Sequence, residues 1–180
     1  MVGPLHLFDR YETLGTNWRG YSVTPTEQYN IKCYINKRLE PCGFEYIMPE
    51  HIAKNHSTVP LHKIFLPKAY GTAGDPKVIG DPFYGEPNSA CSFSYIVIGY
   101  SPEKHNFSKQ ECENILSYMK TKFFRYMVTI RKKTQDNPGP VFQFVPLQDF
   151  SKSWTDSELY KKYDLSTNQI KHIDKLINPM

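Results

Sequence analysis

The stretch S-K-Q-E-C-E-N-I-L-S-Y-M-K-T-K-F-F-R-Y-M-V-T-I-R-K-K, residues 108–133, decides the fold that we expect. Apolar residues recur in it at steps of three and four, which is the spacing of one face of an α-helix. They are Cys112, Ile115, Leu116, Met119, Phe123, Tyr126, Met127 and Ile130. Ser108 and Glu111 have the spacing of a capping box. We therefore predict one long helix of about 22 to 25 residues that begins after Ser108.

The same stretch concentrates positive charge. The 180-residue chain has a net charge of +4, whereas residues 108–133 alone carry +5, because seven basic residues are opposed only by Glu111 and Glu113. The seven are Lys109, Lys120, Lys122, Arg125, Arg131, Lys132 and Lys133. Such a concentration is typical either of a solvated helix face or of a surface that contacts phosphates.

Residues 1–107 are rich in strand and loop signals. Short β-prone runs bounded by Pro and Gly occupy residues 30–36, 44–48 and 61–66. Residues 68–88 hold so many Gly and Pro that we expect no long regular element there. The run S-F-S-Y-I-V-I-G-Y at 92–100 is apolar on both faces at its centre, so we expect it inside a sheet.

Residues 108–180 are mostly helical by the same criteria, although residues 141–145 have the composition of a strand. Capping-box spacings at Thr155 with Glu158 and at Ser166 with Gln169 predict two short helices, 156–163 and 167–177. Two such helices also suggest a helix-turn-helix, but the second is only mildly basic, which favours a packed terminal subdomain. We predict an α+β fold: one domain, 1–180, with a small, mainly antiparallel sheet, one long helix and a helical C-terminal subdomain.

Composition argues against several classes of protein. No run approaches the 18 apolar residues of a membrane span, and His6, Asp9 and Arg10 interrupt any signal-peptide core, so we expect a cytoplasmic protein without a membrane partner. The four cysteines show no C-x-x-C spacing, and the six histidines show no metal-ligand spacing, so we expect no metal site. Cys91 and Cys112 are interpreted as small core residues.

Two short motifs suggest chemistry only weakly. Asp81-Pro82-Phe83-Tyr84 resembles the D-P-P-Y motif of amino-group methyltransferases, but Phe replaces the second Pro and no Gly-rich cofactor loop precedes it, so we interpret it as a turn. Asp75-Pro76-Lys77 is the one acid-x-Lys triplet of the kind that Mg²⁺-dependent nucleases use, and it lies in a loop where no strand would hold its geometry. We expect no catalytic residue in this chain.

Five blocks of sequence carry a resemblance to a known family. They are K-A-Y-G (68–71), T-K-F-F-R-Y (121–126), K-K-T-Q (132–135), F-V-P-L-Q-D-F-S-K-S-W-T-D-S-E-L-Y-K-K-Y (144–163) and I-D-K-L-I (173–177). Over residues 61–180 the chain resembles the C-terminal target-recognition region of bacterial type II restriction–modification adenine-specific DNA methyltransferases, including methyltransferase–endonuclease fusions. Asp164 stands where the resemblance leads us to expect a Gly, at a left-handed helix exit.

The resemblance implies a sequence-selecting DNA-binding domain that lacks the methyl-transfer domain, as a fragment or a stand-alone remnant of a larger enzyme. Its partners would be double-stranded DNA and an upstream methyltransferase domain. This chain would hold no cofactor, whereas the parent would use S-adenosylmethionine and, if it also cleaves DNA, Mg²⁺.

The resemblance and the basic stretch together select candidate DNA-binding residues. They are Lys68, Tyr70, Lys122, Arg125, Arg131, Lys132 and Lys133. Lys122 and Arg125 lie off the apolar stripe, so we expect them to reach outward; the alternative for Arg125 is an internal salt bridge to an acid such as Asp149. Tyr70 is as well suited to the core as to the surface. Candidates for base readout are Asn17, Arg19, Gln28 and Asn30.

Two other functions stay open at this point. The chain could be a small Mg²⁺-dependent nuclease that uses Asp75 and neighbouring acids. It could also be a protein-interaction domain whose basic face meets an acidic partner.

Overall fold

The computed structural model describes residues 7–8, 14–15, 17–35, 43–71, 74–99 and 106–180. Within these residues the strands are β1 (Ile31–Tyr34), β2 (Phe44–Ile47), β3 (Lys63–Pro67), β4 (Phe83–Gly85), β5 (Ser89–Cys91) and β6 (Tyr95–Ile98). The α-helices are α1 (Lys109–Lys120), α2 (Lys122–Thr129), α3 (Asp156–Lys162) and α4 (Thr167–Leu176). Short 3-10 helices are η1 (Pro49–His51), η2 (His56–Thr58) and η3 (Gly139–Phe142). His6, Asp9 and Arg10 lie outside the described residues.

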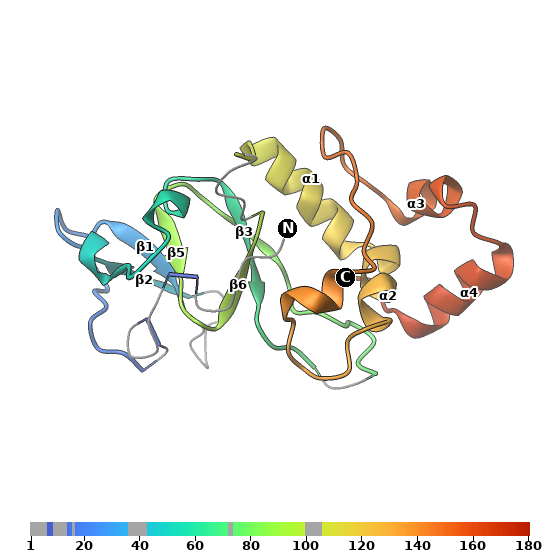
Figure 1. The fold of residues 1–180 in the computed structure, drawn as a ribbon, viewed down its shortest axis with the longest axis horizontal. Helices are drawn as coiled ribbons and strands as arrows, with labels where there is room; N and C mark the ends of the chain where they lie inside the picture. The colour runs from blue at the N-terminus through green and yellow to red at the C-terminus, as the bar shows by residue number, and fades with distance from the viewer. Residues whose placement is uncertain (1–6, 9–13, 16, 36–42, 72–73, 100–105) are drawn as a thin grey trace.

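The strands form two small sheets rather than one. Their orders are β2-β1-β5 and β4-β3-β6, and every pairing is antiparallel except that of β1 with β5. Figure 1 shows β1 and β2 at one end of the molecule, β3 and β6 in the middle, and the helices at the other end. The predicted α+β class, with mainly antiparallel sheets, is confirmed.

The β4-β3-β6 sheet is buried on both faces because its side chains alternate between two cores. Ile64 and Ile96 pack with the helices, whereas Phe65 and Val97 pack with the β2-β1-β5 sheet. β6 is nevertheless an edge strand, so the expectation that it lies inside its sheet is wrong. Its apolar character arises because it lies between two layers, and not because strands flank it on both sides.

The single long helix is divided at Thr121. Its backbone is extended there (φ −63°, ψ 150°), α1 ends one residue before it, and α2 begins one residue after it. The Thr121 hydroxyl donates to the Tyr118 carbonyl at 2.7 Å and accepts from the Phe124 amide at 3.1 Å. One side chain thus ends one helix and caps the next, while the apolar stripe continues past the break.

The three predicted capping boxes, which open α1, α3 and α4, are all formed. Asp164 adopts the left-handed conformation expected at that position, with φ +50°. Cys91 and Cys112 are buried, as expected of core residues. None of the described helices has the length and apolar character needed to cross a membrane.

Two local predictions were wrong. Residues 141–145 do not form a strand; η3 begins at Gly139 instead, because Pro140 fixes a helical φ and lacks an amide for a strand ladder. Phe83 and Tyr84 belong to β4 and not to a turn, because Phe65 and Ile64 of β3 pair with them.

Candidate nucleic-acid interface

Residues 68–71, which follow β3, lie beside residues 131–137, which follow α2. Ala69 and Asp136 form an isolated antiparallel β-bridge. The Tyr70 amide donates to the Gln135 carbonyl at 2.9 Å, and the Asn137 amide donates to the Lys68 carbonyl at 2.7 Å. The buried Asn137 side chain also donates to the Pro67 carbonyl at 3.0 Å. Two blocks of the family resemblance, distant in sequence, therefore form one local structure.

We call Lys68, Tyr70, Arg131, Lys132 and Lys133 the exit surface. Arg131 and Lys133 are exposed, and neither side chain has a hydrogen-bonding or ionic partner among the described residues. Lys132 between them is only partly exposed, and its Nζ donates to the carbonyls of Tyr70 at 3.1 Å and Val78 at 2.5 Å. The Lys132 side chain therefore links the segment after α2 to the backbone at Tyr70 and Val78. Its neighbours Arg131 and Lys133 are free to bind an external anion.

Burial lowers the pKa of the Lys132 ammonium, and Asp75 and Asp136 act in the opposite direction. The hydrogen bonds to the Tyr70 and Val78 carbonyls explain why the Lys132 ammonium can lie half-buried, since a buried ammonium needs acceptors for its protons. The sequence did not distinguish Lys132 from its neighbours, because the acceptors come from other segments of the chain.

Lys68 and Tyr70 are both partly buried. The Lys68 Nζ lies 6.0 Å from the centre of the Phe93 ring, and the Lys77 Nζ lies 5.2 Å from the centre of the Tyr70 ring. Lys77 is also paired with Asp81 at 2.7 Å. Tyr70 thus belongs to the exit surface as a partly buried ring that the Lys77 ammonium approaches.

Arg125 does not reach outward, and that expectation is wrong. Its side chain is 0% exposed and donates to four backbone carbonyls. They belong to Thr121 (3.2 Å), Lys77 (3.3 Å), Lys120 (3.2 Å) and Asn178 (2.7 Å). The alternative partner Asp149 is exposed and accepts from the Ser151 amide instead. The planar guanidinium suits this role because it offers five donors in fixed directions.

Burial lowers the pKa of Arg125, and the nearby carboxylates of Asp156 and Asp81 partly offset the effect. A guanidinium stays charged even so, because its ordinary pKa lies far above neutral pH. Arg125 therefore connects the junction of α1 and α2 with the backbone at Lys77 and with the backbone at Asn178, near the C-terminal end of the chain.

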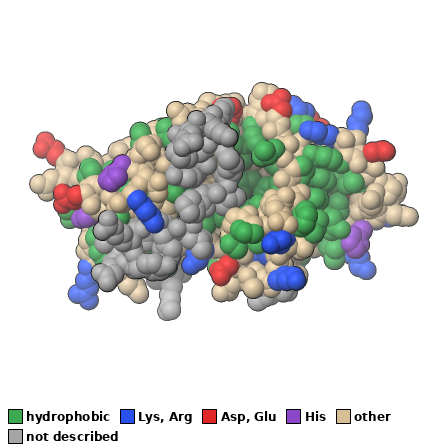
Figure 2. All heavy atoms as spheres, viewed as in Figure 1, with side chains coloured by type: hydrophobic (Ala, Val, Ile, Leu, Met, Phe, Trp, Pro, Cys, Tyr) green, Lys and Arg blue, Asp and Glu red, His purple; other side chains and the backbone are tan. Residues whose placement is uncertain are grey.

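The other cations of α1 and α2 are mostly paired. The Lys122 Nζ lies 2.5 Å from Asp174 of α4, and Lys109 lies 3.8 Å from Glu113. Lys122 is thus less available to a phosphate than its position off the apolar stripe suggested. Figure 2 shows Lys and Arg side chains scattered over the visible face rather than gathered over α1 and α2.

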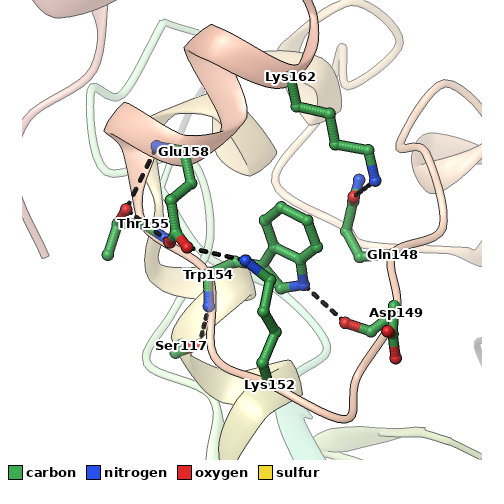
Figure 3. Close-up of polar contacts among 8 residues, drawn as sticks. All are labelled: Ser117, Gln148, Asp149, Lys152, Trp154, Thr155, Glu158 and Lys162. Carbon is green, nitrogen blue, oxygen red and sulfur yellow. Dashed lines mark hydrogen bonds and ion pairs between the residues drawn. The ribbon is translucent and has the colours of Figure 1, made fainter.

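The 144–163 block, the most distinctive part of the resemblance, builds a network around Trp154 (Figure 3). The indole ring lies between the ammonium groups of Lys152 and Lys162, at 4.1 and 4.6 Å from its centre. Its Nε1 donates to the Asp149 carbonyl at 2.7 Å, and the Trp154 amide donates to the Ser117 hydroxyl of α1 at 3.0 Å. This block therefore fastens the chain before α3 onto α1.

Polar side chains complete the network. The Lys162 Nζ donates to Gln148 at 2.7 Å, and the Gln148 amide donates to the Tyr163 hydroxyl at 2.8 Å. Hydrogen bonds from Lys152 and from Thr155 lower the pKa of the Glu158 carboxyl to about 2. Lys152 and Lys162 thus have internal partners, whereas Lys161 is exposed and its side chain has no hydrogen bond or ion pair among the described residues.

An apolar hollow of about 550 Å³ lies over α1 and η3, with Met119, Phe142 and Phe150 among its walls. It falls within the broad apolar area visible in Figure 2. None of the described residues that line it is charged, so it offers no charged group to a phosphate.

The two motifs with possible chemistry are engaged in local contacts. Asp75 accepts from the Lys77 amide at 2.8 Å, and Asp81 pairs with Lys77. Tyr84 of the D-P-F-Y stretch lies 2.5 Å from the His62 Nδ1. Among the described residues, no three His, Cys, Asp or Glu side chains come together in a way that could hold a metal ion.

Comparisons with known proteins add no assignment: no protein-family model, curated protein or solved structure matches the chain.

Proposed function

We propose that this domain binds duplex DNA through the exit surface and selects the sequence on which a restriction–modification adenine methyltransferase acts. The observation that carries the proposal is the pair of exposed, unpartnered cations Arg131 and Lys133, held beside residues 68–70 by the internal bonds of Lys132. Contacts with phosphates dominate the affinity of proteins for DNA and fix their register on the duplex.

The resemblance supplies the biological context of the proposal. An upstream methyltransferase domain of the parent protein would bind S-adenosylmethionine and transfer the methyl group, and a fused endonuclease would use Mg²⁺. Both reactions act on cytoplasmic DNA in bacteria, so the domain would work in the cytoplasm. The chain described here would contribute neither cofactor binding nor a catalytic residue.

Sequence selection needs side chains that reach the edges of bases. Asn17, Arg19, Gln28 and Asn30 are all exposed, which this role requires. They belong to the segment before β1, at the end of the molecule far from α4 (Figure 1). In the proposed function the exit surface positions the duplex, and this segment is the candidate reader.

The proposal is tested by titrating a fluorescent duplex with the chain at several salt concentrations. About three cations at the interface predict that log K falls with log[salt] with a slope near −3. Competition between duplexes of different sequence then separates a sequence-selecting domain from a basic surface that binds any polyanion. A flat salt dependence, or no binding at low salt, would contradict the proposal.

A further inference from the structure

A cleft lies between α2 and α4. Its volume is about 300 Å³, and its walls include Phe123, Tyr126 and Met127 of α2 and Asn168, Gln169 and His172 of α4. Pockets that bind small molecules combine mostly apolar walls with a few polar groups, and this volume lies at the lower end of their range. The cleft is therefore suited to a ligand of one flat ring system.

The floor of the cleft is aromatic and held in place. The Phe123 ring stacks on Tyr163, with centres 5.0 Å apart and planes inclined by 9°. The Tyr126 ring meets His172 edge to face, at 5.8 Å and 87°. Phe123 is only 4% exposed, so the partly exposed Tyr126 ring is the part of the floor on which a base could stack. Exposed aromatic rings stack nucleobases with little regard to their identity.

The rim on the α4 side is polar and basic. Four residues share one face of α4, because they lie three, four and seven positions after the first of them. They are Asn168, Lys171, His172 and Lys175. All four are exposed, and none of their side chains has a hydrogen bond or ion pair among the described residues. Asp174, the acid on this helix, is occupied by Lys122.

The rim can therefore supply amide and imidazole groups to the edge of a base and ammonium groups to a phosphate. Gln169 adds a donor, because its Oε1 accepts from Ser166 at the helix cap while its amide nitrogen is left for a ligand. These groups are placed around an aromatic floor, which is the combination that binds unpaired nucleotides.

The cleft and the exit surface are neighbours along the chain. Met127 of α2 lines the cleft, α2 ends at Thr129, and Arg131 of the exit surface follows two residues after that end. Four residues of chain span at most about 14 Å, so a strand whose phosphates contact Arg131 would pass within reach of the cleft.

We propose that the α2–α4 cleft binds one unpaired nucleotide of a nucleic-acid strand, with its base on the aromatic floor and its phosphate at Lys171 and Lys175. This site deepens the proposed function, because it makes an extrahelical base part of the DNA contact. Its occupant is distinct from the paired bases that the exposed N-terminal segment would read.

The test uses the isotopically labelled chain, with dAMP and deoxyribose 5-phosphate as probes in NMR titrations. We expect dAMP to shift the amide signals of Tyr126, Asn168 and His172 with millimolar affinity. Deoxyribose 5-phosphate should bind roughly tenfold more weakly, because it lacks the base whose stacking contributes this factor.

Matched variants assign the parts of the site. Asn168→Ala with His172→Ala should reduce the preference for dAMP, because the base loses these polar partners but keeps its stacking on the floor, whereas His56→Ala, which removes an exposed histidine from η2, should leave the preference unchanged. Lys171→Ala with Lys175→Ala should weaken both probes equally. Spectra without ligand establish that each variant is folded.

Equal binding of the two probes, or shifts confined to residues outside the cleft, would overturn the inference. The inference rests on the proposed function, but the two can fail separately. Binding of dAMP in the cleft by a chain that binds no duplex would reject the proposed function alone, and duplex binding without any shift in the cleft would reject this inference alone.

Discussion

The helices α1 and α2 and the segment that follows them are both rich in basic residues, but they use these residues differently. Arg125 is bound to backbone carbonyls, and Lys122 is paired with Asp174. Arg131 and Lys133 of the following segment have no internal partner among the described residues. The comparison shows that charge counted along a sequence does not measure charge on a surface, because a long side chain inside a fold meets acceptors that the sequence does not place near it.

Lys132 combines both behaviours. Its neighbours on either side are exposed, while its own ammonium holds the carbonyls of Tyr70 and Val78. A basic pair is thus presented outward because the residue between them is held inward.

The largest effect is expected from Arg125→Met. The change removes four side-chain hydrogen bonds to backbone carbonyls at the α1–α2 junction, at Lys77 and at Asn178. The carbonyls of Thr121 and Lys77 keep a backbone donor, from the amides of Arg125 and Ile79. We expect the free energy of unfolding to fall by about 4 kcal/mol. Urea denaturation measures it, and Lys120→Met, at an exposed neighbour, should change it by less than about 0.5 kcal/mol. A loss below about 1 kcal/mol for Arg125→Met would show that the four bonds are dispensable.

Lys63 extends the comparison to a buried cation that can lose its proton. Its Nζ donates to the carbonyls of Val59, Glu86 and Ser89, each at 3.1 Å, and burial lowers its pKa to about 8. Since the unfolded chain keeps the ordinary value of about 10.4, the unfolded state binds more protons between pH 8 and that value. The contribution of Lys63 to stability therefore rises with pH across this window and is constant below it.

The measurement is the difference in unfolding free energy between the wild-type chain and Lys63→Met as a function of pH. We expect this difference to shift in favour of the wild-type chain by about 3 kcal/mol from pH 8 to 10.5. The opposing titration of Tyr118, whose pKa burial raises, cancels in the difference because Lys63 does not act on it. A difference that does not vary with pH would mean that Lys63 titrates normally.

A smaller effect is expected for the ion pair between α2 and α4. Asp174→Asn removes the carboxylate charge beside Lys122 in a pair that is partly open to solvent. The expected loss is about 0.5 to 1 kcal/mol in low salt and less in 1 M NaCl, because solvent and salt screen such pairs. Thermal unfolding at the two salt concentrations measures it, and an effect that salt does not reduce would argue against an electrostatic origin.

The smallest effect concerns the exit of α3, where Asp164 has φ +50°. Asp164→Gly should stabilise the chain by about 0.5 kcal/mol, because glycine adopts this conformation without steric cost. Ser157→Gly, inside α3, is the matched control and should destabilise it. A destabilising Asp164→Gly would show that the gain in the folded state is outweighed by the greater freedom of the unfolded chain.

Local signals predicted much of the helical half. The capping boxes at Ser108, Thr155 and Ser166 place the starts of three helices correctly because each depends on residues only three positions apart. The break at Thr121 was missed because its capping hydroxyl lies within an apolar stripe that continues on the other side. The division into two sheets was missed because strand pairing is decided by contacts between distant segments.

The candidate site was predictable only in part. The exposure of Arg131 and Lys133 agrees with their position after the apolar stripe ends. The Arg125 side chain points inward because it donates to the carbonyls of Lys77 and Asn178, and these carbonyls lie near it only in the folded chain. The α2–α4 cleft depends in the same way on two helices whose contact no local pattern specifies.

The most direct test compares two charge-matched variants in duplex titrations between 50 and 200 mM salt: Arg131→Ala with Lys133→Ala, and Lys109→Ala with Lys120→Ala. Removing the exit pair should weaken binding to every duplex and make the log–log salt slope less negative by about 2, whereas removing the α1 pair should leave the slope unchanged. Equal changes in slope for the two variants would show that net charge, and not the exit surface, holds the DNA.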